Sequence, residues 1–176
     1  HLQYLPYHFL LFSACGDNHV RWQDISTGQQ VAEWNTKAGV ATACSINPSN
    51  AITLTGHAGG VVSLWSPTIS SPLVKMFVHK GPVKAIAVDS SGLYMATAGT
   101  DGMLKTWDMR TFKQLDQYKL MGRSADSLAI SQTGLLAAST GPHLTIWKDI
   151  FKSHQKTPYM RHLVPGESIH QVSFAP

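Results

Sequence analysis

The sequence predicts an all-β fold made of short antiparallel strands, and three observations support this. Apolar residues alternate with polar or small ones in short runs, which is the pattern of half-buried strands. Clusters of Gly, Pro, Asn, Asp and Ser separate the runs, as turns between strands require. Four tryptophans recur 43, 42 and 40 residues apart: Trp22, Trp65, Trp107 and Trp147. A repeat of this length indicates an architecture built from similar units.

The unit around Trp107 shows the pattern most clearly. Four strands are expected in it: Val83–Val88, Leu93–Ala98, Met103–Trp107 and Gln114–Leu120. Ser90–Gly92 separates the first two, and Asp101-Gly102 is a typical hairpin turn between the next two. The unit is therefore predicted to form one sheet of four antiparallel strands.

The other units follow the same plan. The first is expected to have strands at Leu2–Leu5, Phe9–Cys15, Val20–Ile25 and Gln30–Trp34. The second is expected to have strands at Val40–Ile46, Ile52–Thr55, Val61–Trp65 and Leu73–Val78. The fourth is expected to have strands at Asp126–Ile130, Leu135–Ser139, Leu144–Trp147 and Tyr159–Val164. A last segment, Ile169–Pro176, is expected to be the first strand of a further unit.

Four strands with Trp-Asp at the end of the third, as in Trp107-Asp108, resemble the blade of a WD-repeat β-propeller. The resemblance implies four complete blades, at about residues 1–36, 37–79, 80–121 and 122–166, with the start of another at 167–176. A ring of seven blades, the common WD arrangement, needs roughly 280–300 residues. The sequence is therefore expected to be a fragment of a longer chain that forms a seven-bladed ring.

The WD resemblance also implies a buried hydrogen-bond chain in the third unit. It would run from the Trp107 indole N–H to the Thr97 hydroxyl, the His79 ring and the Asp101 carboxylate. Thr, His and Asp are also residue types of hydrolase triads, but geometry and not residue type defines a triad. The structural interpretation is favoured, and no catalytic residue is predicted.

The neighbouring units retain only part of this set. The second has Thr55 and Trp65, but Lys37 stands at the position of the histidine and a glycine at that of the aspartate. The fourth is interpreted as having Ser139 and Trp147, without the aspartate. The His57 that ends the second unit's second strand is expected to have a structural role in the turn.

Composition narrows the function classes. Hydrophobic residues make up 43% of the chain and charged residues 14%, which indicates a globular protein. Cys15 and Cys44 lack CxxC spacing, which argues against a metal site and favours a reducing compartment. No metal-binding histidine motif or Gly-rich phosphate loop is present, so no metal, cofactor or small-molecule substrate is expected. No apolar run approaches the ~20 residues of a membrane helix, and the net charge of +4 permits an anionic partner.

Three segments carry a closer resemblance: 5–11 (LPYHFLL), 47–67 with its Gly-His and Ser-Leu-Trp-Ser-Pro landmarks, and 94–97 (YMAT). They resemble the BING-type WD proteins, a nucleolar family of the small-subunit processome. The resemblance spans nearly the whole sequence. It implies a non-catalytic scaffold in the nucleolus that takes part in pre-rRNA processing. The implied partners are other processome proteins, with pre-rRNA or a small nucleolar RNP as a further candidate.

The connection after Trp147 is a candidate contact surface. It carries Lys148, Phe151, Lys152 and Lys156, and Arg161 follows in the next strand. Such cations can attract phosphates, and an exposed aromatic can stack on a base or anchor a protein. The alternative interpretation is an ordinary solvated loop, which is what most runs of charge are.

A second function class remains open. Trp107, Asp108 and Arg110 have the Trp-Asp-x-Arg form, which resembles the box through which some WD proteins bind the adaptor of a cullin-type ubiquitin ligase. The chain would then be a substrate receptor of that ligase. In the simpler interpretation, Asp108 and Arg110 only pair with each other at the end of the strand.

Overall fold

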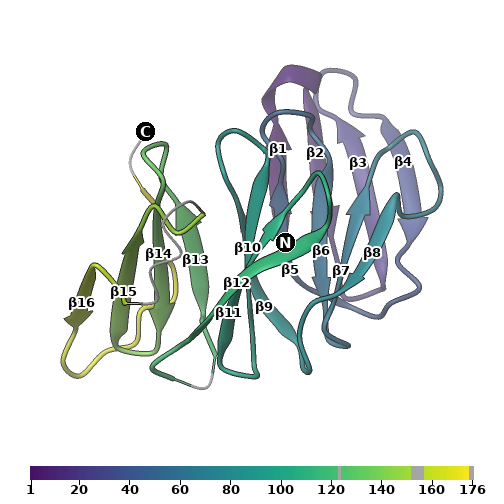
Figure 1. Ribbon diagram of the computed structural model, residues 1–176. Helices are drawn as coiled ribbons and strands as arrows, with labels where there is room; N and C mark the ends of the chain where they lie inside the picture. The colour runs from purple at the N-terminus through teal and green to yellow at the C-terminus, as the bar shows by residue number, and fades with distance from the viewer. Residues whose placement is uncertain (123, 152–156, 175–176) are drawn as a thin grey trace.

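The computed structural model describes residues 1–122, 124–151 and 157–174, and these residues form four separate four-stranded sheets (Figure 1). Sheet 1 contains β1 (Leu2–Leu5), β2 (Leu10–Ala14), β3 (His19–Asp24) and β4 (Gln30–Asn35). Sheet 2 contains β5 (Ala41–Ile46), β6 (Thr53–His57), β7 (Val61–Trp65) and β8 (Val74–Phe77). Sheet 3 contains β9 (Val83–Val88), β10 (Tyr94–Gly99), β11 (Met103–Asp108) and β12 (Lys113–Lys119). Sheet 4 contains β13 (Ser127–Ile130), β14 (Leu135–Thr140), β15 (His143–Lys148) and β16 (Met160–Leu163).

Each sheet is an antiparallel meander, because its strands pair in sequence order. The predicted fold class is therefore confirmed: the chain is all-β, with four-stranded sheets arranged as WD-type blades. The meander gives every sheet two loop ends. At one end, the first strand of each sheet joins the second strand. In sheet 1 this connection is the short 3₁₀ turn η1 (Pro6–His8), so we call this end the η1 end. The opposite end holds the linkers between sheets, residues 36–40, 78–82 and 120–126, and we call it the linker end.

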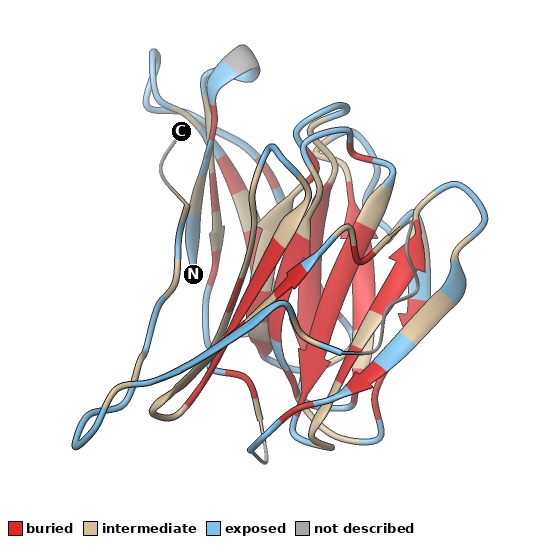
Figure 2. Ribbon diagram, turned by 60° about the vertical axis from the view of Figure 1, so that its left-hand side comes forward, coloured by how far each residue is buried: buried red, intermediate tan, exposed pale blue. Residues whose placement is uncertain are grey.

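The apolar core lies between neighbouring sheets. One cluster joins sheets 1 and 2 around Phe12, Trp22 and Trp65. A second joins sheets 2 and 3 around Leu54, Met95 and Trp107, and a third joins sheets 3 and 4 around Leu104, Leu136 and Trp147. Figure 2 shows the buried residues along the middle of the sheets and the exposed residues in the loops. Stacking of sheets, rather than any single sheet, therefore supplies the apolar burial.

Polar contacts also join sheets 2 and 3 and sheets 3 and 4. The Thr42 hydroxyl donates to the Val83 carbonyl at 2.6 Å. Between the same two sheets, the Asn47 side-chain amide donates to the Gly92 carbonyl at 2.9 Å, and Asn47 is buried. The Tyr118 hydroxyl reaches the Ile150 carbonyl at 3.4 Å, which links sheets 3 and 4. These bonds fix the relative register of neighbouring sheets, which apolar packing alone specifies loosely.

Two expected strands differ from the structure. Phe9 does not begin β2, since it follows the 3₁₀ turn in the left-handed region at φ 53° and is exposed. Pro6 explains this, because it lacks the N–H that would extend the strand ladder. The segment 169–174 is not a strand. The Ile169 amide bonds the Gly141 carbonyl and the Val172 amide bonds the Ser127 hydroxyl, so its backbone bonds form no ladder.

Candidate functional site

Sheet 3 brings together the four residues of the expected hydrogen-bond chain. The Trp107 indole N–H donates to the Thr97 hydroxyl at 3.0 Å. The hydroxyl lies 3.0 Å from His79 Nε2, and His79 Nδ1 lies 3.0 Å from both carboxylate oxygens of Asp101. Since Asp101 accepts, Nδ1 carries the proton and Nε2 accepts from Thr97. Every donor along this chain therefore has an acceptor.

Burial dominates the electrostatics of this chain. His79 and Thr97 have no exposed surface. Burial lowers the pKa of His79 below its ordinary value, because the charged form loses its hydration, although Asp101 acts in the opposite direction. The Thr97 hydroxyl already accepts from Trp107 and has no open side toward solvent. A buried hydroxyl of this kind has no access to a substrate.

Sheet 2 contains a second chain, which the sequence interpretation missed. The Trp65 indole donates to the Thr55 hydroxyl at 2.8 Å, and that hydroxyl lies 3.0 Å from His57 Nε2. His57 Nδ1 lies 3.1 Å from the Gly39 carbonyl, which takes the role that Asp101 has in sheet 3. The signal was present in the sequence, since His57 stands two residues after Thr55 and strand periodicity places both side chains on one face.

The two histidines reach equivalent places by different routes. In sheet 3 the ring comes from the linker, and the strand position two residues after Thr97 is Gly99. A Cβ on Gly99 would lie 2.6 Å from His79 Cγ, so this glycine leaves the room that the ring fills. In sheet 2 the strand supplies His57, and the linker has Lys37 at the corresponding position. One site thus accepts a histidine from either element, but only one at a time.

The described residues of sheets 1 and 4 form no such chain. The cross-strand pairing puts Ala138, and not Ser139, at the position of Thr97, so the sequence interpretation of Ser139 was wrong by one residue. A shift of one residue turns a side chain to the opposite face of the sheet. Among the residues that the structure describes, the Trp147 indole N–H is consequently buried without a hydrogen-bond partner. The same holds for Trp22, because sheet 1 has Ala14 at the position of Thr97.

The candidate ligase box forms a local ion pair. Two nitrogens of the Arg110 guanidinium contact the Asp108 carboxylate, Nε at 3.2 Å and Nη2 at 2.9 Å. The Arg110 backbone amide also donates to Asp108 at 2.8 Å. These hydrogen bonds lower the pKa of Asp108. Trp107 is buried beneath them, so in this chain the box is a strand-end cap with an exposed arginine.

Only part of the candidate contact surface falls within the described residues. Lys148 ends β15 and is exposed, and Arg161 is exposed in β16. Lys152 and Lys156 lie outside the described residues. Phe151 does not present a free ring, because it is half-buried and stacks on Tyr94 with centroids 5.1 Å apart.

Other site classes find no support in the part of the chain that the structure describes. No group of three or more His, Cys, Asp or Glu side chains is placed to hold a metal ion there. Within the same residues, no helix has the length and apolar character to cross a membrane.

Comparison with known proteins places these observations in a family. The model described as "WD domain, G-beta repeat" matches residues 70–108, which run from the end of sheet 2 through β11. The chain is 45% identical to U3 small nucleolar RNA-associated protein 7 of Saccharomyces cerevisiae, over 100% of this chain and 34% of that protein. It is 41% identical to human WD repeat-containing protein 46, over 99% of this chain and 29% of the relative. The Caenorhabditis elegans protein of that name is 42% identical, over 94% of this chain and 28% of the relative.

The chain thus spans about a third of the length of the curated relatives it matches. The matched repeat contains the complete Trp107–Thr97–His79–Asp101 chain, and all four sheets follow the blade plan. The chain is a member of the WD-repeat protein family.

Proposed function

We propose that this chain forms part of a non-catalytic scaffold in small-subunit ribosome biogenesis, acting in the small-subunit processome of the nucleolus. The observation that carries the proposal is the 45% identity to a U3 small nucleolar RNA-associated protein, which extends over the whole of this chain. Its partners would be other processome proteins and the U3 small nucleolar RNP, with pre-rRNA as a direct contact.

The geometry is consistent with a scaffold. The Thr-His-Asp groups of sheet 3, which have the residue types of a hydrolase triad, are buried and committed to one another. They hold the blade together instead of facing a cleft. The chain would therefore act through its loop ends and outer strands, as a rigid support for proteins and RNA.

The test is to tag the whole protein, follow its sedimentation and isolate what co-purifies. We expect it to sediment with large pre-ribosomal particles and to recover U3 small nucleolar RNA. Depletion should cause precursors of early small-subunit rRNA cleavage to accumulate. Sedimentation away from these particles, with unchanged pre-rRNA processing, would overturn the proposal. Recovery of a cullin adaptor that is lost on Arg110→Ala would assign the ligase function instead.

A further inference from the structure

We infer that the linker end of sheets 2 and 3 is a cationic surface that binds the phosphate backbone of single-stranded RNA, through Lys37, Lys80 and Lys84. The inference rests on the proposed function, since it names an RNA contact within an RNA-containing particle. It goes beyond that function because it assigns the contact to particular residues and to one end of the sheets.

Two successive linkers each carry a lysine. Lys37 stands in the linker between sheets 1 and 2, and Lys80 in the linker between sheets 2 and 3, 43 residues further on. Lys84 follows near the start of β9, where it lines a groove of about 530 Å³ along the first strands of the sheets. All three side chains are exposed. The blade repeat therefore brings these positive charges to the same end of neighbouring sheets.

A second lysine supports each linker. Lys75 Nζ donates to the Thr36 carbonyl at 3.5 Å, next to Lys37. Lys105 Nζ donates to the Val78 carbonyl at 2.6 Å, two residues before Lys80. A carbonyl is neutral, so this hydrogen bond leaves the charge of each ammonium group uncompensated. The same arrangement thus occurs twice, with one lysine fixed on the linker backbone and one extended into solvent.

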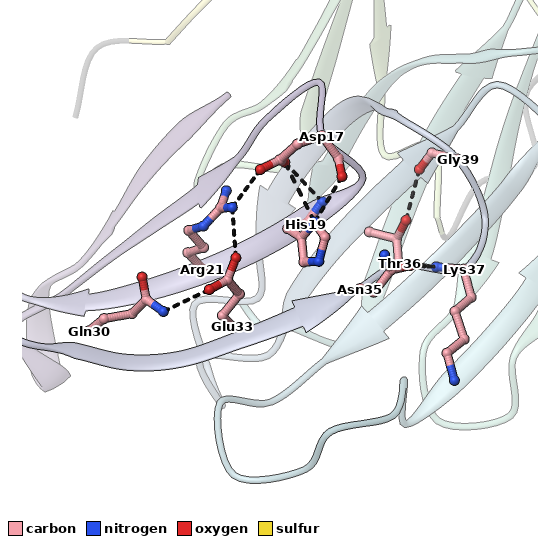
Figure 3. Close-up of polar contacts among 9 residues, drawn as sticks. All are labelled: Asp17, His19, Arg21, Gln30, Glu33, Asn35, Thr36, Lys37 and Gly39. Carbon is pink, nitrogen blue, oxygen red and sulfur yellow. Dashed lines mark hydrogen bonds and ion pairs between the residues drawn. The ribbon is translucent and has the colours of Figure 1, made fainter.

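One carboxylate at this end lies beside a proposed contact, because Asp101 bonds His79 and also accepts from the Lys80 backbone amide at 3.4 Å. Asp126 accepts from the Gly141 amide at 3.0 Å. Asp17 holds Arg21, which Glu33 also contacts at 2.7 Å (Figure 3). Figure 3 shows the contrast with Lys37, whose side chain extends away from this cluster with no ion pair drawn at its ammonium group. In sheet 2 the position of Asp101 is Gly59, so this turn adds no acid beside Lys37.

The two loop ends differ in apolar exposure. The η1 end carries four aspartates, Asp24, Asp89, Asp108 and Asp149, together with the cations Arg110, Lys113 and Lys148. It also carries most of the large apolar side chains exposed in loops: Phe9, Ile25, Ile69, Leu73, Leu93 and Tyr159. Protein partners use apolar anchors of this kind. The linker end exposes fewer such side chains, Val40, Phe77 and Met121, and its lysines suit a phosphate backbone, which takes point charges and carries no sequence information.

The test compares two triple variants of the whole protein for binding to fluorescent oligouridine over a range of salt concentrations. The first changes the proposed contacts: Lys37→Gln, Lys80→Gln and Lys84→Gln. The control removes the same charge from exposed cations of sheet 3 that belong to neither candidate RNA surface: Arg110→Gln, Lys113→Gln and Lys119→Gln. The first variant should lose at least about tenfold in affinity at low salt. Its slope of log affinity against log salt should fall by roughly 2, at about 0.7 per contact with single strands. Neither variant should change the thermal unfolding midpoint by more than a few degrees.

Three results would overturn the inference: unchanged binding in the first variant, an equal loss in the control, or competition by poly-glutamate as effective as that by RNA. The last result would assign the surface to an acidic protein. Co-sedimentation with pre-ribosomal particles separates the two proposals. If the first variant kept its RNA affinity while the parent protein sedimented with the particles, only this inference would fail.

Discussion

At the scale of single residues, the tryptophans that define the repeat are not equivalent. Trp65 and Trp107 donate to buried threonines, whereas Trp22 and Trp147 have alanine at that position and an indole N–H without a partner. All four are buried. The repeat spacing therefore reports a packing role that all four share, and hydrogen bonding adds to it in two sheets only.

The first prediction compares Trp107→Ala with Trp147→Ala. Each change leaves a cavity that costs about 3–5 kcal/mol. Trp107→Ala also removes the hydrogen bond that the indole donates to Thr97, which contributes roughly 0.5–1.5 kcal/mol, while Thr97 keeps its bond to His79. Urea denaturation should therefore show the larger loss for Trp107→Ala. Equal losses would mean that the hydrogen-bond chain adds nothing to packing.

The second prediction concerns pH. Burial lowers the pKa of His57 in the folded protein, and no carboxylate bonds its ring. At a pH between the pKa of His57 in the folded protein and its pKa in the unfolded chain, the unfolded chain binds more protons. The contribution of His57 to the free energy of unfolding is therefore complete above about pH 6.5 and decreases as the pH falls between these two pKa values. His57→Gln should lower stability at neutral pH and also reduce its decline between about pH 7 and 5. Urea midpoints at several pH values measure this.

A matched control is His162→Gln, which removes a histidine from the exposed strand β16. It should leave both the midpoint at neutral pH and the slope with pH close to those of the parent. If His57→Gln had the same acid-induced loss as the parent, protonation of His57 would not be a cause of that loss.

The sequence predicted the residues of one chain but not of the other, for a physical reason. The spacing of the WD repeat identified the first set, which is His79, Thr97, Asp101 and Trp107. His57 enters the site from a different element, and only the packed structure shows that two elements converge on one site. Ser139 was misassigned because a strand position has meaning only once its register is fixed, and here the pairing places Ala138 opposite Thr145.

At the scale of elements, linker and strand compete for the histidine site, and this leads to a third prediction. Gly99→His alone would crowd His79, since even a Cβ there lies 2.6 Å from the ring. His79→Ala alone would leave Thr97 and Asp101 without their partner. The double variant should restore the arrangement of sheet 2, with the ring supplied by the strand. It should therefore unfold at a higher urea concentration than either single variant. A double variant as unstable as the sum of both single losses would show that the two routes are not interchangeable.

Most strands could be predicted because alternation and turn residues are local signals. The predicted ranges agree with β5 to β15 within a few residues. The exceptions depend on contacts beyond the segment itself. The η1 turn displaces the start of β2, and the segment 169–174 would need a partner strand to form a ladder. Alternation shows that a segment can be a strand, but pairing decides whether it is one.

At the scale of the whole molecule, the stacking of sheets places groups that the sequence separates. Lys37, Lys80 and Lys84 gather at one end because each linker returns the chain to the same side of the stack. The candidate contact loop after β15 was identified from its local charge density. The linker lysines are single charges in separate repeats, so only the repeat geometry makes them a surface.

The fourth prediction follows from how burial changes across each sheet. The second strands β6 and β10 are almost wholly buried, whereas all four residues of the outer strand β16 are exposed. Amide exchange requires local opening, whose free energy is lowest where few apolar contacts hold a segment. Hydrogen exchange followed by mass spectrometry should therefore show the slowest exchange in peptides from β6 and β10, and the fastest strand exchange in β16. The order should persist in Trp147→Ala, which loosens sheet 4 without changing which strand is outermost. If β16 were as protected as β10 in the purified protein, another part of the protein would cover this strand. Met160 and Leu163, which are exposed here, would be the first residues to examine for that contact.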